Sequence, residues 1–197
     1  YGGRSIFSDA EVENLVRETY RYVSSYIYMN ELTEGSGIST HGWNKLYRPK
    51  KIRDEREKIW PYPNDDALYL VASLDVRTDP VVISFPSLVC NYASVRVFSF
   101  DSSIQVPLTS RQDNFVKEET VLFYSDHTKN MPKDDLPFID HFVKLSGDFA
   151  MAVLTVVPDL TQKKSVPQNA QAVRKTQLAA LPEYLEMEYH ETRTYPN

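Results

Sequence analysis

Three consecutive short polar residues, Asn64, Asp65 and Asp66, stand directly before a run of strand-forming residues. Adjacent carboxylates repel each other, so partial burial would raise the pKa of one and suit it to acid or base chemistry. Tyr69 or Tyr92 could then donate a hydrogen bond to a developing oxyanion. Asn and Asp also start Asx turns, and on spacing alone a turn that begins a strand is the favoured interpretation.

The alternative is a small-molecule enzyme with Asp66 as its acid or base, Asp65 as the neighbour that tunes it, and Tyr69 as a donor. Asn64 would orient the substrate. Asp75 and Asp101, which each close a predicted strand, could join this site with Tyr92 as ligand-binding residues. This hypothesis requires a pocket that contains the carboxylates.

Other chemistry has weaker support. The chain has no glycine-rich phosphate loop and no G-x-S-x-G elbow. Its four histidines form no metal-ligand spacing, so we expect no metal and no cofactor. Asp140 and His141 are adjacent, and on a strand they would point to opposite faces and not pair directly. Cys90 cannot form an internal disulfide and is expected to be a small buried residue.

Composition describes an ordinary globular chain. It has 197 residues, 42% hydrophobic and 25% charged, with 13 Tyr and a net charge of -5. The acidic balance argues against nucleic acid as a partner. No apolar run approaches the roughly 20 residues that span a bilayer. Composition does not indicate a cellular compartment.

Periodicity predicts a helix, several strands and a second helix. A capping-box pattern at Ser8–Glu11 precedes an amphipathic helix from Asp9 to Asn30, expected to pack on a sheet. A last helix is expected from Gln168 to Leu181. The predicted strands are Leu68–Val76, Val81–Phe85, Tyr92–Phe100, Ile104–Leu108, Thr120–Tyr124 and Phe149–Val157, with Phe138–Leu145 ambiguous.

The first two strands are predicted to form a β-hairpin across Asp79-Pro80. The expected fold is α+β: an antiparallel β-sandwich or sheet flanked by a long N-terminal helix and a C-terminal helix. Residues 1–185 should form one domain, and residues 186–197 an extended tail that could dock on a neighbour.

The stretch Pro63–Tyr69 resembles the P-N-N-D-T-L-Y signature of the domain of unknown function 1254 (DUF1254) family. Ser73–Val76 and Pro80–Val82 are similar to its next strand and to its P-V-V turn. The helix "YRYVSSYIYMN", the segment "DHFVKLSGDFAMAVLTVV" and a closing helix with Gln177 are similar to further parts of the family. Asp65 and Ala67 depart from the signature.

The resemblance implies a β-rich fold with flanking helices and no settled activity. Family members commonly carry a second, jelly-roll-like domain downstream, so this chain is expected to be a lone N-terminal-type domain. The favoured function is a non-catalytic binding or assembly module that contacts a protein partner or forms a homo-oligomer. The enzyme, with a small-molecule ligand, is the alternative. A weaker one is sugar or peptide stacking on Trp43, Trp60 and Tyr62.

Overall fold

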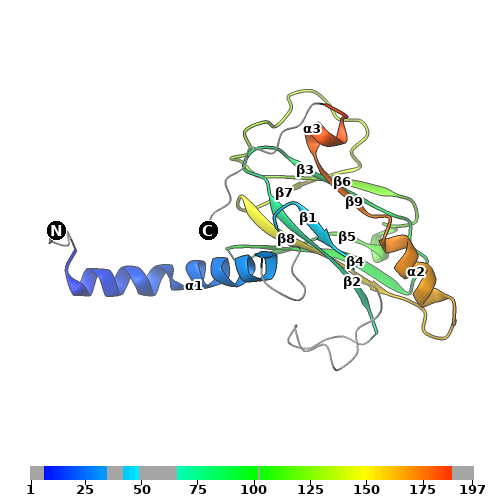
Figure 1. The fold of residues 1–197 in the computed structure, drawn as a ribbon, viewed down its shortest axis with the longest axis horizontal. Helices are drawn as coiled ribbons and strands as arrows, with labels where there is room; N and C mark the ends of the chain where they lie inside the picture. The colour runs from blue at the N-terminus through cyan, green and yellow to red at the C-terminus, as the bar shows by residue number, and fades with distance from the viewer. Residues whose placement is uncertain (1–6, 35–41, 49–65, 102, 188–197) are drawn as a thin grey trace.

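Two β-sheets pack against each other, and a long helix leaves one side of the pair (Figure 1). The computed structural model describes residues 7–34, 42–48, 66–101 and 103–187. The helices are α1 (Asp9–Glu34), η1 (Ser110–Gln112), α2 (Ser165–Val173) and α3 (Leu181–Tyr184). The strands are β1 (Lys45–Tyr47), β2 (Leu68–Asp75), β3 (Val81–Phe85), β4 (Tyr92–Ser99), β5 (Ile104–Thr109), β6 (Glu119–Tyr124), β7 (His141–Lys144), β8 (Phe149–Val157) and β9 (Gln177–Ala180).

The strand orders are β1-β2-β8-β4-β5 in the larger sheet and β7-β6-β3-β9 in the smaller one. All neighbours are antiparallel except β6 and β7. One apolar core joins Leu70 and Leu154 of the larger sheet to Ile83 and Phe123 of the smaller sheet. The sheets therefore bury their facing sides against each other, and the predicted α+β class with N- and C-terminal helices is confirmed.

The predicted hairpin between β2 and β3 is wrong, because the two strands lie in different sheets. Both strands are buried almost throughout, and each pairs on both sides with other strands. The short link from Val76 to Pro80 carries the chain from one sheet to the other. The neighbouring strands β7 and β8 also belong to different sheets.

The predicted closing helix over Gln168–Leu181 is also wrong in its second half. The helix α2 begins earlier, at Ser165, and ends at Val173. Residues Gln177–Ala180 instead form β9, which pairs antiparallel with β3. Tertiary pairing with a buried strand thus overrides a local helical pattern.

The predicted capping box begins α1 as expected. The Ser8 N–H donates to the Glu11 carboxylate at 2.8 Å, and the Glu11 N–H donates to Ser8 Oγ at 3.4 Å. These bonds satisfy donors that have no partner inside the helix. The hydrogen bond from the Ser8 backbone lowers the pKa of Glu11.

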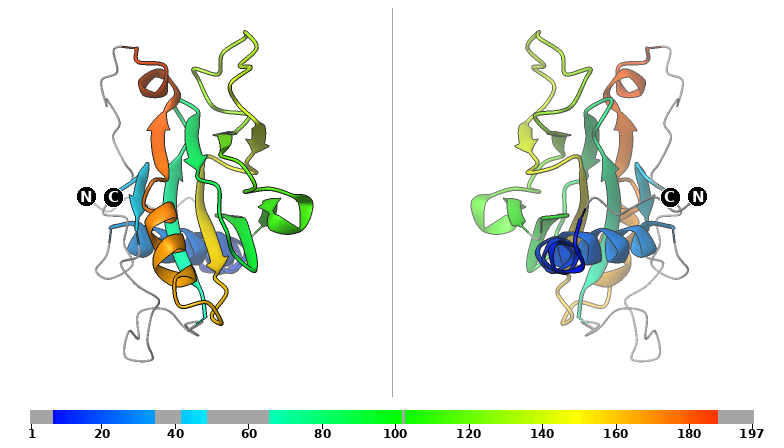
Figure 2. Two further views of the ribbon diagram at one scale, coloured as in Figure 1. Left: turned by 90° about the vertical axis from the view of Figure 1, so that its right-hand side faces the viewer. Right: turned by 90° about the vertical axis from the view of Figure 1, so that its left-hand side faces the viewer.

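Only the C-terminal part of α1 packs on the larger sheet. Tyr26 and Met29 join an aromatic cluster with Trp43, Phe100 and Phe149 on the outer face of that sheet. Thr33 Oγ1 also lies 3.1 Å from Ser73 Oγ of β2. The expectation that the helix packs along a sheet thus holds for one end, and the other end extends away from the body (Figure 1). Figure 2 looks nearly along the axis of this helix.

Candidate functional site

The predicted acidic motif is only partly visible. Asn64 and Asp65 lie outside the described residues, as do Trp60 and Tyr62. Asp66 is exposed just before β2. Tyr69 is half-buried on the outer face of the larger sheet, opposite Thr155, and packs against the aromatic cluster.

Tyr92 lies at the same end of the sheet, as the first residue of β4 opposite Val157. The Arg111 guanidinium sits 5.5 Å from the centre of the Tyr92 ring. The nearby Ser94 and then Thr109 hydroxyls lower the pKa of the Tyr92 phenol. This ring is therefore half-buried and held by its neighbours in the sheet.

Asp75, at the far end of β2, is tied to the backbone and to Arg77. Its carboxylate is fully buried and accepts hydrogen bonds from Arg77 Nε at 3.0 Å, Nη2 at 2.9 Å and the Arg77 N–H at 3.1 Å. The Arg77 guanidinium stacks 4.8 Å from the Phe149 ring centre. Asn44 holds the Asp75 backbone on the other side, donating to its C=O and accepting from its N–H. This arrangement anchors the end of β2.

Asp101 is exposed at the same end of the sheet, after β4. Its carboxylate accepts from the Ser103 N–H at 2.9 Å. Burial raises its pKa, but bonds from Ser103 and Ser146 outweigh that effect and lower the pKa of Asp101 overall.

The candidates do not share one location on the sheet. Tyr69 and Asp75 pair with β8 residues that are six positions apart, which corresponds to about 20 Å of strand. The described candidates therefore form two groups at opposite ends of one sheet.

A polar cluster that the sequence did not indicate joins the connections at the Asp75 end. Ser125 Oγ donates to Asp148 Oδ1 at 2.7 Å, and His127 Nδ1 lies 3.2 Å from the same oxygen. Thr128 Oγ1 donates to the Val76 C=O at 2.8 Å. These are the residue types of a catalytic triad, but here the carboxylate stands between serine and histidine. The imidazole is not placed to take the serine proton, and the cluster ties three connections together.

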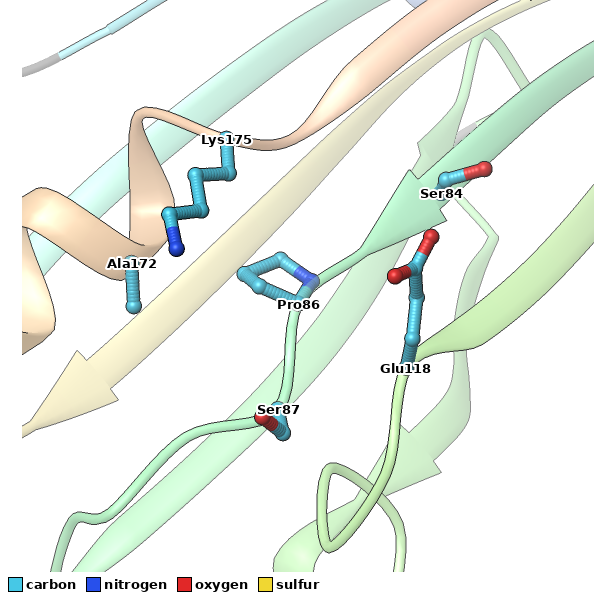
Figure 3. A pocket seen from close by; sticks show the side chains of 6 residues that line it. All are labelled: Ser84, Pro86, Ser87, Glu118, Ala172 and Lys175. Atoms are coloured by element: carbon cyan, nitrogen blue, oxygen red, sulfur yellow. The ribbon is translucent and has the colours of Figure 1, made fainter.

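A pocket of about 180 Å³ opens elsewhere, between β3, the start of β6 and α2 (Figure 3). In Figure 3 the Lys175 and Glu118 side chains lie on opposite sides of Pro86. The volume is below the ~300–1,000 Å³ typical of drug-sized ligands. None of the residues proposed from the sequence lines it; its lining residues are Ser84, Pro86, Ser87, Glu118, Ala172 and Lys175.

The largest exposed apolar feature described along one element is on α1. Seven of its apolar or aromatic side chains are between 42% and 66% exposed. At 3.6 residues per turn, all of these except Tyr28 fall within about 140° of the helix circumference. We call this set the exposed α1 face; it consists of Val12, Leu15, Val16, Tyr20, Val23 and Ile27.

Comparison with known proteins identifies the family. The profile described as "Protein of unknown function (DUF1254)" matches residues 43–180, well over half of the chain. The chain belongs to the DUF1254 family. No curated protein matches it.

Two solved structures resemble this DUF1254 protein. The VPA0106 protein of Vibrio parahaemolyticus has a TM-score of 0.69 at 17% identity, over 93% of this chain and 42% of that one. An uncharacterised protein from Burkholderia cenocepacia has a TM-score of 0.46 at 15% identity, over 98% of this chain and 47% of that one. The first likeness supports the fold alone. The chain spans less than half the length of either structure.

The described residues of this DUF1254 protein contain no group of three or more His, Cys, Asp or Glu side chains arranged to hold a metal ion. No helix among them combines the length and apolar content that crossing a bilayer needs.

The exposed α1 face did have a signal in the sequence, because its apolar spacing is visible there. What the spacing could not indicate is that most of this face has no sheet beneath it.

Proposed function

We propose that the protein is a non-catalytic binding or assembly module, and that it makes protein–protein contacts through the exposed α1 face. One observation carries the proposal: six apolar side chains stay exposed on a helix whose first half extends away from the sheets (Figure 1). Contiguous apolar surface of this kind typically marks an interaction site.

The energetics of α1 support a covered helix. Isolated helices are marginal in water, and most helical stability in proteins comes from packing an apolar face. Val12, Val16 and Val23 are β-branched, which lowers helix propensity further. Burying six half-exposed side chains is worth about 1 kcal/mol each. A partner that covers the face would therefore stabilise the helix as it binds.

The separation of the polar candidates also favours binding over acid/base chemistry. The Asp75 carboxylate already accepts hydrogen bonds from Arg77. Asp75 also lies about 20 Å along the sheet from Tyr69. An enzyme built from Asp66 and Tyr69 would have to work without Asp75 and Asp101. The enzyme hypothesis therefore loses two of the seven residues that it named.

Site-specific photo-crosslinking in cells tests the proposal. A photoreactive amino acid placed at Val16 should form protein adducts, since this side chain is in the exposed α1 face. The matched control is Asn14, which is exposed two residues away and lies on the opposite side of the helix. Equal adduct formation from both positions, or none from Val16, would contradict a protein-binding role for this face.

A further inference from the structure

The partner of the exposed α1 face can be inferred from the charges and shape of the helix; this step rests on the proposed function. The first quarter of α1 carries Asp9, Glu11 and Glu13 and no cation. The stretch Ser24–Asn30 carries no charge of either sign. Any partner must therefore tolerate three carboxylates at one end of the face and an uncharged surface at the other.

We propose that a second copy of this chain covers the exposed α1 face, as an antiparallel helix pair. With the twofold axis between Arg17 and Glu18, Val12 of one copy lies opposite Val23 of the other. Leu15 then lies opposite Tyr20. The same set of residues thus supplies both halves of the contact, as a twofold interface requires.

Charge selects the antiparallel orientation. A parallel pair would place Asp9, Glu11 and Glu13 beside the same residues of the other copy, where like charges repel. An antiparallel pair places each acidic end beside the uncharged stretch of its partner. It also keeps the helix dipoles opposed.

The shape of the molecule permits this pairing. The sheets lie only at the C-terminal end of α1 (Figure 1), so an antiparallel pair places the two bodies at opposite ends. The contact from Val12 to Ile27 runs along about 24 Å of helix. The two bodies therefore do not compete for the same space along it.

The buried area matches a small but specific dimer. A fully exposed aliphatic side chain presents roughly 60–120 Å² and a tyrosine about 200 Å². The five aliphatic side chains and Tyr20, at their observed exposures, therefore offer roughly 350 Å² of apolar surface per copy. Because about 60% of an interface is apolar, the pair would bury about 1,200 Å² in total. That is the lower limit for stable protein interfaces, so the dimer should dissociate on dilution.

A membrane surface fits this helix less well. Helices that lie on membranes are typically rich in Lys and Arg on their polar side. The polar residues of α1 include six carboxylates, against Arg17 and Arg21. An anionic lipid surface would repel this helix, so binding of α1 to anionic vesicles would count against the proposal.

Sedimentation of the full chain tests the pairing. The weight-average mass should rise from one chain to two as concentration increases. Val16→Glu, which puts two carboxylates about 4.5 Å apart along the axis near the middle of the contact, should raise the dissociation constant at least ~100-fold. Asn14→Glu makes the same charge change on the opposite side of α1 and should leave the constant unchanged. A strict monomer at all concentrations overturns the pairing.

Disulfide trapping tests the orientation in a Cys90→Ser background. Mixing the single variants Val12→Cys and Val23→Cys should give a crosslinked heterodimer. Val12→Cys alone should crosslink poorly, because its two copies would be about 16 Å apart along the axis. Efficient crosslinking of Val12→Cys with itself overturns the antiparallel arrangement. If the protein is monomeric while Val16 still forms face-specific adducts with a different protein, the proposed function stands and self-pairing fails.

Discussion

Replacing Asp75 with asparagine should lower the free energy of unfolding by about 2–3 kcal/mol. The carboxylate is fully buried and accepts three hydrogen bonds from Arg77. Asparagine keeps one acceptor oxygen but presents an NH₂ group toward Arg77 Nη2. The variant therefore loses one charge-assisted hydrogen bond, worth about 1.5–3 kcal/mol, and the charge that balances the guanidinium.

The exposure of Arg77 sets the upper limit of this effect. Removing one partner of a fully buried ion pair costs about 3–5 kcal/mol. The Arg77 side chain is 33% exposed, so water still solvates part of its charge and the cost falls below that range. For a domain of this size, the melting temperature should fall by about 5–10 °C.

Urea unfolding followed by circular dichroism measures the change, with Asp101→Asn as the matched control. Asp101 is exposed and accepts from the Ser103 N–H, so its replacement should cost less than about 1 kcal/mol. Adding Arg77→Met to Asp75→Asn should restore part of the stability, because the uncompensated charge is removed. If Asp75→Asn unfolds at the wild-type urea midpoint, the inference that the Asp75–Arg77 contact stabilises the fold is refuted.

Two further measurements concern groups with shifted pKa values. Hydrogen bonds from Lys117 and then the Thr120 N–H depress the pKa of Asp140 below its ordinary value of 3.8. Lys117→Met should therefore be less stable than wild type at neutral pH. The difference should shrink as pH falls through and below 3.8, since protonation of Asp140 ends the attraction; a difference independent of pH would contradict this cause. Burial raises the pKa of the Cys90 thiol, so the folded protein should react with iodoacetamide more slowly than the urea-unfolded chain at the same pH, and equal rates would contradict this burial.

The sequence predicted those elements that local periodicity determines. The strand Phe149–Val157 was predicted at its observed bounds, and the start of α1 at Asp9 followed from the Ser8–Glu11 capping box. Alternation along Tyr92–Phe100 also puts Val95 and Val97 on one face and Arg96 and Phe98 on the other, and in β4 the two valines are the ones that face the core. In each case the signal lies within one turn of helix or one strand.

Pairing between elements could not be predicted in the same way. A short link between two apolar strands fits a hairpin as well as a crossing between sheets, and β2 and β3 form the latter. Gln177–Ala180 forms a strand because it pairs with the edge of the buried strand β3. No local sequence pattern reveals this pairing. For the site, the sequence placed Asp75 at the end of a strand, as a candidate ligand-binding residue. The sequence could not show that the guanidinium of Arg77, two residues later, forms an ion pair with the Asp75 carboxylate.

The position of β8 between β2 and β4 affects how the protein is made. The central pair of the larger sheet joins Leu68–Asp75 to Phe149–Val157, so β2 leaves the ribosome long before its main neighbour exists. Chains grow from the N-terminus, and unpaired apolar strands of this kind are prone to aggregate. Nascent chains halted before residue 149 should therefore hold β2 without its long partner, with only the three residues of β1 to pair on its other edge.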